Sequence, residues 1–195
     1  MHERLRVEEM QLQVSKRPRS TKGVRSQLRR EGGVPAVLYA KGKESQTLTI
    51  NRADIQKILR ELKPGTLSTL VLELQGMGSP IRAIIKEMQY QKTSYDVLHV
   101  DLLELLDGQP VRVNVPVELT GVAESIAVKA GGVIRQVARQ VAVECLPGDI
   151  PREFFVDVRD LEMVGSSKRV KSIGLNQGVK MRALAEDVLA VVAKR

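Results

Sequence analysis

The chain has 195 residues, with 31 Lys or Arg against 23 Asp or Glu, so its formal net charge at pH 7 is +8. This length allows one large domain or two small ones, and the positive charge favours a polyanionic partner over a basic surface kept only for solubility. Hydrophobic residues make up 43%, which excludes a disordered chain, while 3% aromatic residues disfavour a stacking platform for single-stranded nucleic acid.

Cysteine and histidine are too few for most metal or redox chemistry. The single cysteine, Cys145, rules out an internal disulfide and a CxxC site, and the Val-rich run VAVEC around it predicts a buried hydrophobic residue. With only His2 and His99, a multi-histidine metal site is excluded, and we expect no metal and no cofactor. No apolar run reaches 18 residues and no secretory signal is evident, so a cytoplasmic location is the simplest interpretation.

The first distinct segment is a basic arm, residues 10–30, with seven Lys or Arg and no acidic residue. Ser, Thr and Gly lie among these bases, a composition that predicts a loop rather than an amphipathic helix. Such a segment is either a solvated, mobile arm or a ligand for a polyanion, and the second interpretation is favoured.

Short strands and one helix are predicted after the arm. The strands fall at residues 34–39, 46–50, 67–74, 81–90 and 96–103. The helix follows Asn51, a favourable capping residue, places Ile55 and Ile58 at helical spacing, and ends at Pro64-Gly65.

A turn-like break at Gly108-Gln109-Pro110 divides the chain into a first domain, residues 1–108, and a second, residues 109–195. Apolar residues alternate from Val111 to Leu119, as in a half-buried strand. Further strands are expected near 137–143 and at 154–158 and 188–192. The predicted fold class is mainly β or α+β, with a small barrel and helices followed by a mostly β domain.

Enzymatic motifs are absent: there is no GxGxxG, P-loop, HExxH or GxSxG pattern. Scattered acids leave a paired-carboxylate site open without indicating one, and we expect no enzyme. On the strand around residue 99, His99 and Asp101 are predicted to face outward, about 7 Å apart along the strand. Such a pair can hydrogen-bond RNA in a shallow minor groove, the alternative being a solvated pair. Tyr39 is either a base-stacking ring or a tyrosine at the edge of the core.

Two stretches carry a resemblance to a known family. The run KGVRSQLRREGGVPAVLY, residues 22–39, and HVD, residues 99–101, resemble signatures of bacterial large-subunit ribosomal protein twenty-five. The length and the β-rich second half resemble its long form, the general-stress protein Ctc type. The resemblance implies a non-catalytic ribosomal protein whose first domain binds 5S rRNA at loop E, with a fold like the anticodon-binding domain of glutaminyl-tRNA synthetase.

The resemblance also implies partners and contacts. The second domain would reach other parts of the central protuberance, among rRNA and neighbouring ribosomal proteins, and the free protein would be a monomer. The RNA-binding residues carried over by position, with Arg30 added from the arm, are Arg17, Lys22, Arg25, Arg29, Arg30, Tyr39, Gln89, His99 and Asp101. Three stretches depart from the family pattern: Gln89-Tyr90-Gln91-Lys92 replaces Gln-x-His-Pro, Ala40 replaces Gly, and Ser172-Ile173 replaces Asp-Leu.

Two other functions compete with this one. A tRNA-binding accessory module is suggested by the likeness to an anticodon-binding domain. A stress-related protein-interaction factor would use the second domain as its main surface.

Overall fold

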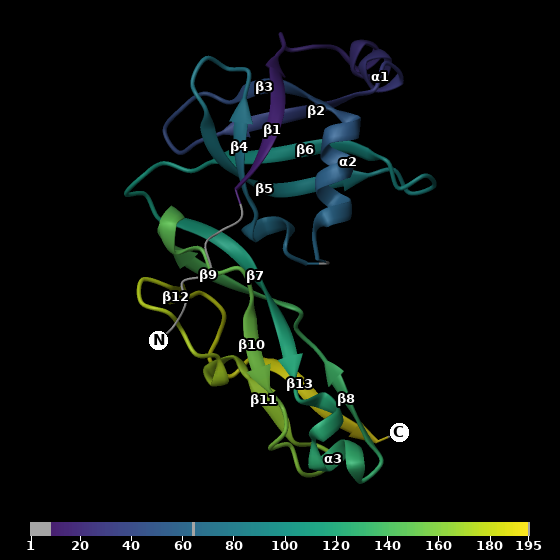
Figure 1. Cartoon of the computed structure of the whole chain (residues 1–195), viewed down its shortest axis with the longest axis vertical. Coiled ribbons are helices and arrows are strands. Elements are labelled where there is room, and N and C mark those ends of the chain that lie inside the picture. The colour runs from purple at the N-terminus through teal and green to yellow at the C-terminus, as the bar shows by residue number, and fades with distance from the viewer. Residues whose placement is uncertain (1–8, 64, 195) are drawn as a thin grey trace. The chain divides into compact units, whose positions relative to one another are not determined.

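The structure is a computed structural model that describes residues 9–63 and 65–194. The chain divides into two compact units, Met1–Gln109 (unit 1) and Pro110–Arg195 (unit 2), each described by itself (Figure 1).

Six strands of unit 1 form a closed barrel in the order β1-β3-β2-β6-β5-β4. Their bounds are β1 Glu9–Lys16, β2 Gly33–Tyr39, β3 Gln46–Asn51, β4 Val71–Gln75, β5 Ile81–Tyr90 and β6 Val97–Glu104. Two neighbouring pairs, β1 with β4 and β2 with β6, are parallel, and the other four are antiparallel. Closure leaves this sheet without a free edge.

The barrel interior is aliphatic because alternate residues of each strand point inward. Leu12, Leu48, Leu72 and Leu102 are each fully buried in it. Pro35 precedes the β2–β6 pairing, which begins at Ala36, so its missing N–H costs no hydrogen bond to β6.

Helix α2, Arg52–Glu61, packs against the barrel through Ile55 and Ile58. The Asn51 side chain accepts a hydrogen bond from the Ala53 amide at 2.9 Å, which confirms the predicted cap. The strand expected from residue 67 begins only at Val71, because residues 67–69 form a 3-10 turn, η1 (Leu67–Thr69). There the Thr69 hydroxyl donates to the Thr66 carbonyl at 3.0 Å, and this local bond competes with the strand conformation.

The prediction of a loop for the whole basic arm is wrong. Residues 9–16 form β1, and α1 spans Lys22–Arg30. Arg29 and Arg30 lie in its last turn, where cations favour the helix dipole. Gly23 and Ser26 lower its helix propensity, but contacts with the barrel offset that cost, as they do for most protein helices.

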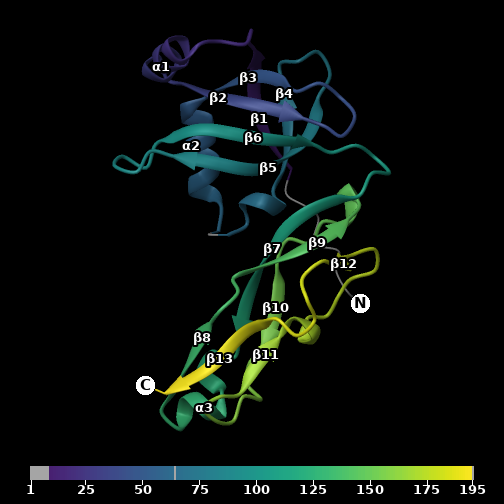
Figure 2. The ribbon, with the colours of Figure 1, turned by 180° about the vertical axis from the view of Figure 1, so that it is seen from behind.

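Unit 2 consists of two small sheets and short turns. The strands are β7 Val111–Thr120, β8 Gly132–Gln136, β9 Gln140–Cys145, β10 Phe154–Asp157, β11 Ser167–Arg169, β12 Lys180–Met181 and β13 Val188–Lys194. The helix α3 (Ile126–Lys129) and the 3-10 turns η2 (Val122–Glu124), η3 (Pro147–Asp149) and η4 (Val170–Ser172) connect them. The sheet orders are β10-β7-β9-β12 and β11-β13-β8, with β13 drawn in yellow in Figure 2.

The two sheets of unit 2 are joined by specific contacts as well as by apolar packing. The Gln136 amide in β8 donates to the Val117 carbonyl in β7 at 2.7 Å. Val115, Val143 and Leu189 are fully buried. In β7, Val111, Val113, Val115 and Val117 are buried as alternation predicted, whereas Leu119 is half-buried and Pro116 is buried as well. The mainly β class, with a barrel followed by a β domain, is confirmed.

Candidate nucleic-acid interface

Helix α1 presents three of its four cations along one face, and its last turn is fastened to the barrel. Lys22, Arg25 and Arg29 are separated by three and four residues and therefore share a helix face. The Arg29 Nε donates to the Leu98 carbonyl of β6 at 3.0 Å. Near the helix end, a Cβ on Gly33 would come within 2.7 Å of Leu28, so only glycine permits this approach.

The hydrogen bond from Arg29 to the Leu98 carbonyl depends on an irregularity of β6. The β5–β6 register runs from Gln89–His99 directly to Tyr90–Val97, which skips Leu98, as a β-bulge does. The Leu98 carbonyl is thereby available to Arg29. Leu98 itself is half-buried and does not belong to the barrel core, contrary to the simple alternation expected for this strand.

Arg17 lies between β1 and α1 and is committed to contacts within the protein. Its Nε donates to the Leu48 carbonyl at 2.9 Å and its Nη1 donates to the Ser20 hydroxyl at 3.1 Å. Burial and the neighbouring charge of Arg25 lower the Arg17 pKa from its ordinary value. Arg17 therefore fixes the path of the chain into α1, and its remaining N–H groups are left for a ligand.

His99 and Asp101 form a side-chain pair on the outer face of β6. His99 Nδ1 lies 3.1 Å from Asp101 Oδ1, and the two side chains are 20% and 29% exposed. Burial lowers the pKa of His99; the Asp101 carboxylate opposes this shift, and the charges of Arg17, Arg29 and Arg25 reinforce it. The neutral ring then donates from Nδ1 to Asp101 and presents Nε2 as a hydrogen-bond acceptor.

Tyr39 and Gln89 flank this pair on β2 and β5. Burial raises the Tyr39 pKa, and the carboxylates of Asp101 and Glu87 raise it further, so its hydroxyl stays protonated. Gln89 is exposed and lies opposite His99 in the sheet register. Tyr39 is therefore close enough to feel the Asp101 charge, and it is half-buried, as expected for a residue at the core edge.

The structure thus places Arg29 next to His99, since it donates to the Leu98 carbonyl, and the charges of Arg17 and Arg25 also act on His99. Lys22 is exposed at the start of α1. Arg30 is also exposed, but at 100° per residue it projects about 140° away from Arg25 around the helix.

Sequence reasoning missed three features of this face. Arg52 donates to the Arg29 carbonyl through its guanidinium and to the Gly32 carbonyl through its amide, so it holds the end of α1. Nothing in the local sequence indicates this role. Glu87 lies opposite Asp101 in the sheet register, its charge acts on Tyr39 from across β6, and its period-two spacing from Gln89 could have revealed it. Arg25 Nε is enclosed and has no acceptor among the described residues.

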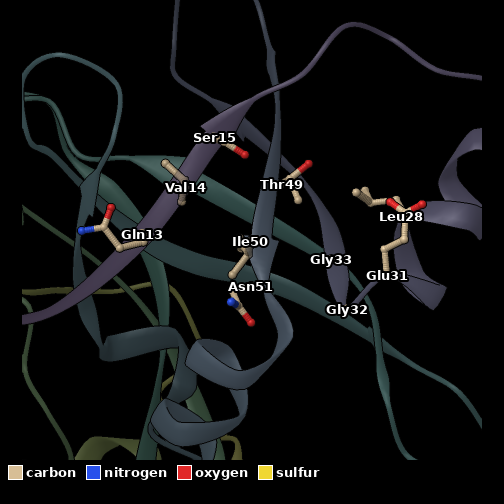
Figure 3. Close-up of a pocket in the computed structure, with 10 residues that line it drawn as sticks. All are labelled: Gln13, Val14, Ser15, Leu28, Glu31, Gly32, Gly33, Thr49, Ile50 and Asn51. Atoms are coloured by element: carbon tan, nitrogen blue, oxygen red, sulfur yellow. The ribbon is translucent and has the colours of Figure 1, made fainter.

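An open depression of about 470 Å³ lies on another side of α1, between its end and strands β1 and β3 (Figure 3). Its lining includes Ser15, Thr49 and Asn51, together with Glu31 from beyond the helix. It contains none of the cations described above, and the Glu31 carboxylate disfavours a phosphate there. We therefore leave it out of the interface.

Other chemistry finds little support in the described ranges 9–63 and 65–194. No group of three or more His, Cys, Asp or Glu side chains there could hold a metal ion. None of the helices described is long and apolar enough to cross a membrane. Cys145 is buried as predicted, and burial, with the charges of Asp149 and Glu144, raises its pKa to about 11, so its thiol is a poor nucleophile.

Ala40, where the family pattern has Gly, needs no left-handed backbone, since the positive φ in this turn belongs to Gly42, at 81°. Ala40 is instead buried. Ser172 and Ile173 close η4, with Ile173 buried in unit 2.

Two family models match the chain. The Ribosomal L25p family matches residues 12–102, and the Ribosomal protein TL5, C-terminal domain, matches residues 110–195. The large ribosomal subunit protein bL25 of Chlamydia pneumoniae is 35% identical over 186 residues, 95% of this chain and all of the relative. Proteins of the same name from Chlamydia muridarum and Chlamydia abortus are 35% and 32% identical over the same shares.

These matches confirm the predicted ribosomal, cytoplasmic and non-enzymatic character. They span both units at a level of identity that shows common family membership. The chain therefore belongs to the ribosomal L25p family of bacterial large-subunit proteins, in its long form with a TL5-type C-terminal domain.

Proposed function

We propose that unit 1 binds 5S rRNA through the face formed by α1, β2, β5 and β6, and that the protein thereby helps to structure the central protuberance. One observation carries the proposal: the charges of Arg17, Arg25 and Arg29 all act on His99, which pairs with Asp101 at 3.1 Å. Positive charge at this density beside hydrogen-bonding groups suits a structured polyanion. Membership of a large-subunit ribosomal family supports RNA as that polyanion.

The cations of α1 would supply most of the affinity by neutralising phosphates and releasing counterions. Lys22 is exposed, whereas Arg29 already donates one N–H to Leu98. Arg25 Nε is enclosed by the protein, so Arg25 would contact a phosphate through its terminal Nη groups. Arg17 would add charge while positioning the helix, and Arg30 would contribute only long-range attraction.

The sheet residues would supply discrimination. A-form RNA hides its base edges in a deep major groove and displays 2′-hydroxyls in a wide, shallow minor groove. Neutral His99 can accept a hydrogen bond at Nε2, while Asp101 and the Gln89 amide can accept from 2′-hydroxyls or exocyclic amines. The Tyr39 hydroxyl can donate. These groups read an irregular minor groove more readily than a regular duplex.

Unit 2 would contact other parts of the central protuberance. Several of its arginines are already neutralised: Arg112 and Arg182 both pair with Glu144, at 3.1 and 2.7 Å, and Arg159 pairs with Asp157 at 2.7 Å. Internal pairing leaves less charge for phosphates, which supports unit 1 as the main RNA-binding part.

The decisive experiment measures binding of the full chain to 5S rRNA against excess tRNA at about 150 mM salt. Gln89→Ala should weaken specific binding by about 1–3 kcal/mol, the value of one good base-edge contact. Gln11→Ala is the matched control, because Gln11 is an exposed glutamine on β1 whose side chain donates to Glu73. His99→Ala should lower the ratio of specific to non-specific affinity.

Other outcomes would point to the competing functions. Equal displacement by tRNA would favour a tRNA-binding accessory module. Loss of all RNA binding at this salt would favour a protein-interaction factor. Equal effects of Gln89→Ala and Gln11→Ala would remove β5 from the interface.

A further inference from the structure

We propose that the tip of the β5–β6 hairpin, residues 90–96, makes a second contact with the bound RNA, in which the Tyr95 ring stacks on an unpaired base. This inference rests on the proposed function of unit 1 and extends its interface beyond the barrel. It concerns the stretch in which the chain departs from the family pattern, Gln89-Tyr90-Gln91-Lys92.

The hairpin tip is held by its own hydrogen bonds. The Gln91 backbone N–H donates to the Asp96 backbone carbonyl at 2.8 Å, and the Tyr95 backbone N–H donates to the Gln91 backbone carbonyl at 2.9 Å. The Ser94 hydroxyl donates to the Asp96 carboxylate at 2.8 Å. These bonds fix the backbone that carries Tyr95, so its ring is presented from an organised turn.

Tyr95 combines an unfavourable backbone conformation with high exposure. Its φ is 57°, and every other positive φ in the described residues belongs to glycine. Its side chain is 79% exposed, and no hydrogen bond or ion pair of that side chain is found within the described ranges. A bulky residue in this conformation is uncommon and strained, and such strain concentrates at binding sites. The exposed ring packs too little against the protein to offset this backbone strain, so a contact with a partner explains its conformation better.

The surroundings of the tip favour RNA as that partner. The same two strands carry Gln89 and His99, so the tip continues the proposed interface. Figures 1 and 2 both show the hairpin projecting from the end of the barrel at which α1 lies. Lys92 is exposed there, while the Asp96 carboxylate is engaged by Ser94. An exposed aromatic ring and an exposed cation in one turn are the groups that stack on bases and attract a phosphate backbone.

Two substitutions separate the ring from the fold. Tyr95→Asn removes the ring and installs a residue that tolerates positive φ, so unit 1 should be at least as stable in urea. Tyr95→Phe keeps the ring and removes only the hydroxyl. With the full chain and 5S rRNA, Tyr95→Asn should weaken binding about fivefold or more, as expected for one lost base stack. Tyr95→Phe should bind within about twofold of wild type, an effect of about 0.4 kcal/mol.

Two further readouts sharpen the test. Stacking releases no counterions, so Tyr95→Asn should leave the slope of log affinity against log salt unchanged. Chemical probing of 5S rRNA should show an unpaired nucleotide protected by wild type and by Tyr95→Phe, but reactive with Tyr95→Asn.

The outcomes distinguish this inference from the function on which it rests. If His99→Ala weakens 5S rRNA binding but Tyr95→Asn matches wild type in affinity and protection, the second contact is overturned, and a protein becomes the candidate partner of the tip. If wild type shows no preference for 5S rRNA over tRNA, the proposed function falls and this inference falls with it.

Discussion

The positive charge of α1 leads to a quantitative prediction for Arg25→Gln. Each phosphate contact contributes about 0.9 to the slope of log affinity against log salt. Lys22, Arg25 and Arg29 together should therefore reduce affinity about 40-fold when salt rises from about 50 to 200 mM. Removal of one contact should lower the slope by about 0.9, so that affinity falls only about 12-fold over the same salt range. Arg25 is the better target, because Arg29 also anchors α1 to Leu98.

The assay is fluorescence anisotropy of labelled 5S rRNA titrated with the full chain at four salt concentrations. Lys57→Gln is the charge-matched control, since Lys57 is an exposed cation on α2. The plot of log affinity against log salt for Lys57→Gln should have the same slope as that of wild type. An Arg25→Gln slope equal to that of wild type, or an equal change in Lys57→Gln, would refute a phosphate contact at Arg25 and leave α1 with only a general electrostatic attraction.

The remaining predictions concern stability and reactivity. All three tyrosines lie in unit 1 and the chain has no Trp, so tyrosine fluorescence in urea follows unit 1 alone. Folding lowers the His99 pKa, so the contribution of His99 to the stability of unit 1 is complete above the unfolded pKa near 6.5 and is lost as pH falls through the folded pKa. His99→Gln should therefore make the stability of unit 1 depend less on pH in this range. An unchanged pH profile of stability would contradict this prediction. Leu72→Ala empties a fully buried position and should cost about 2–5 kcal/mol, whereas a midpoint equal to wild type would rule out a packed barrel. Cys145, with a pKa of about 11, should resist a thiol reagent at about pH 8 until denaturant is added, and rapid labelling of the native chain would show that it is accessible.

Sequence patterns correctly predicted the elements that are determined by neighbouring residues. The strand at 81–90 was predicted with the same bounds that the structure shows, and Asn51 caps α2 as expected. The outward direction of His99 and Asp101 also followed from alternation, although only the structure shows their side chains 3.1 Å apart.

Features that depend on contacts between residues distant in sequence could not be predicted from local patterns. Helix α1 has no buried residue of its own, so its sequence carries no apolar stripe, and its order comes from Leu98, Arg52 and Gly33. Arg17 was expected to meet RNA, but its contact with the Leu48 carbonyl depends on a strand 31 residues away. The bulge at Leu98 is equally invisible to period-two reasoning, because it is defined by the register of the partner strand.

The pairing of β1 sets the order of events during synthesis. This strand is the first to leave the ribosome, yet its neighbours in the barrel are β3 and β4, with Glu9 opposite Val71 and Val14 opposite Ile50. The barrel is complete only when β6, which ends at Glu104, has also emerged. At 5–20 residues per second, the nascent chain spends roughly 5–20 s between completion of β1 and completion of the barrel. Contacts between such distant segments form slowly, so an arrested or truncated chain would expose open strand edges prone to aggregation.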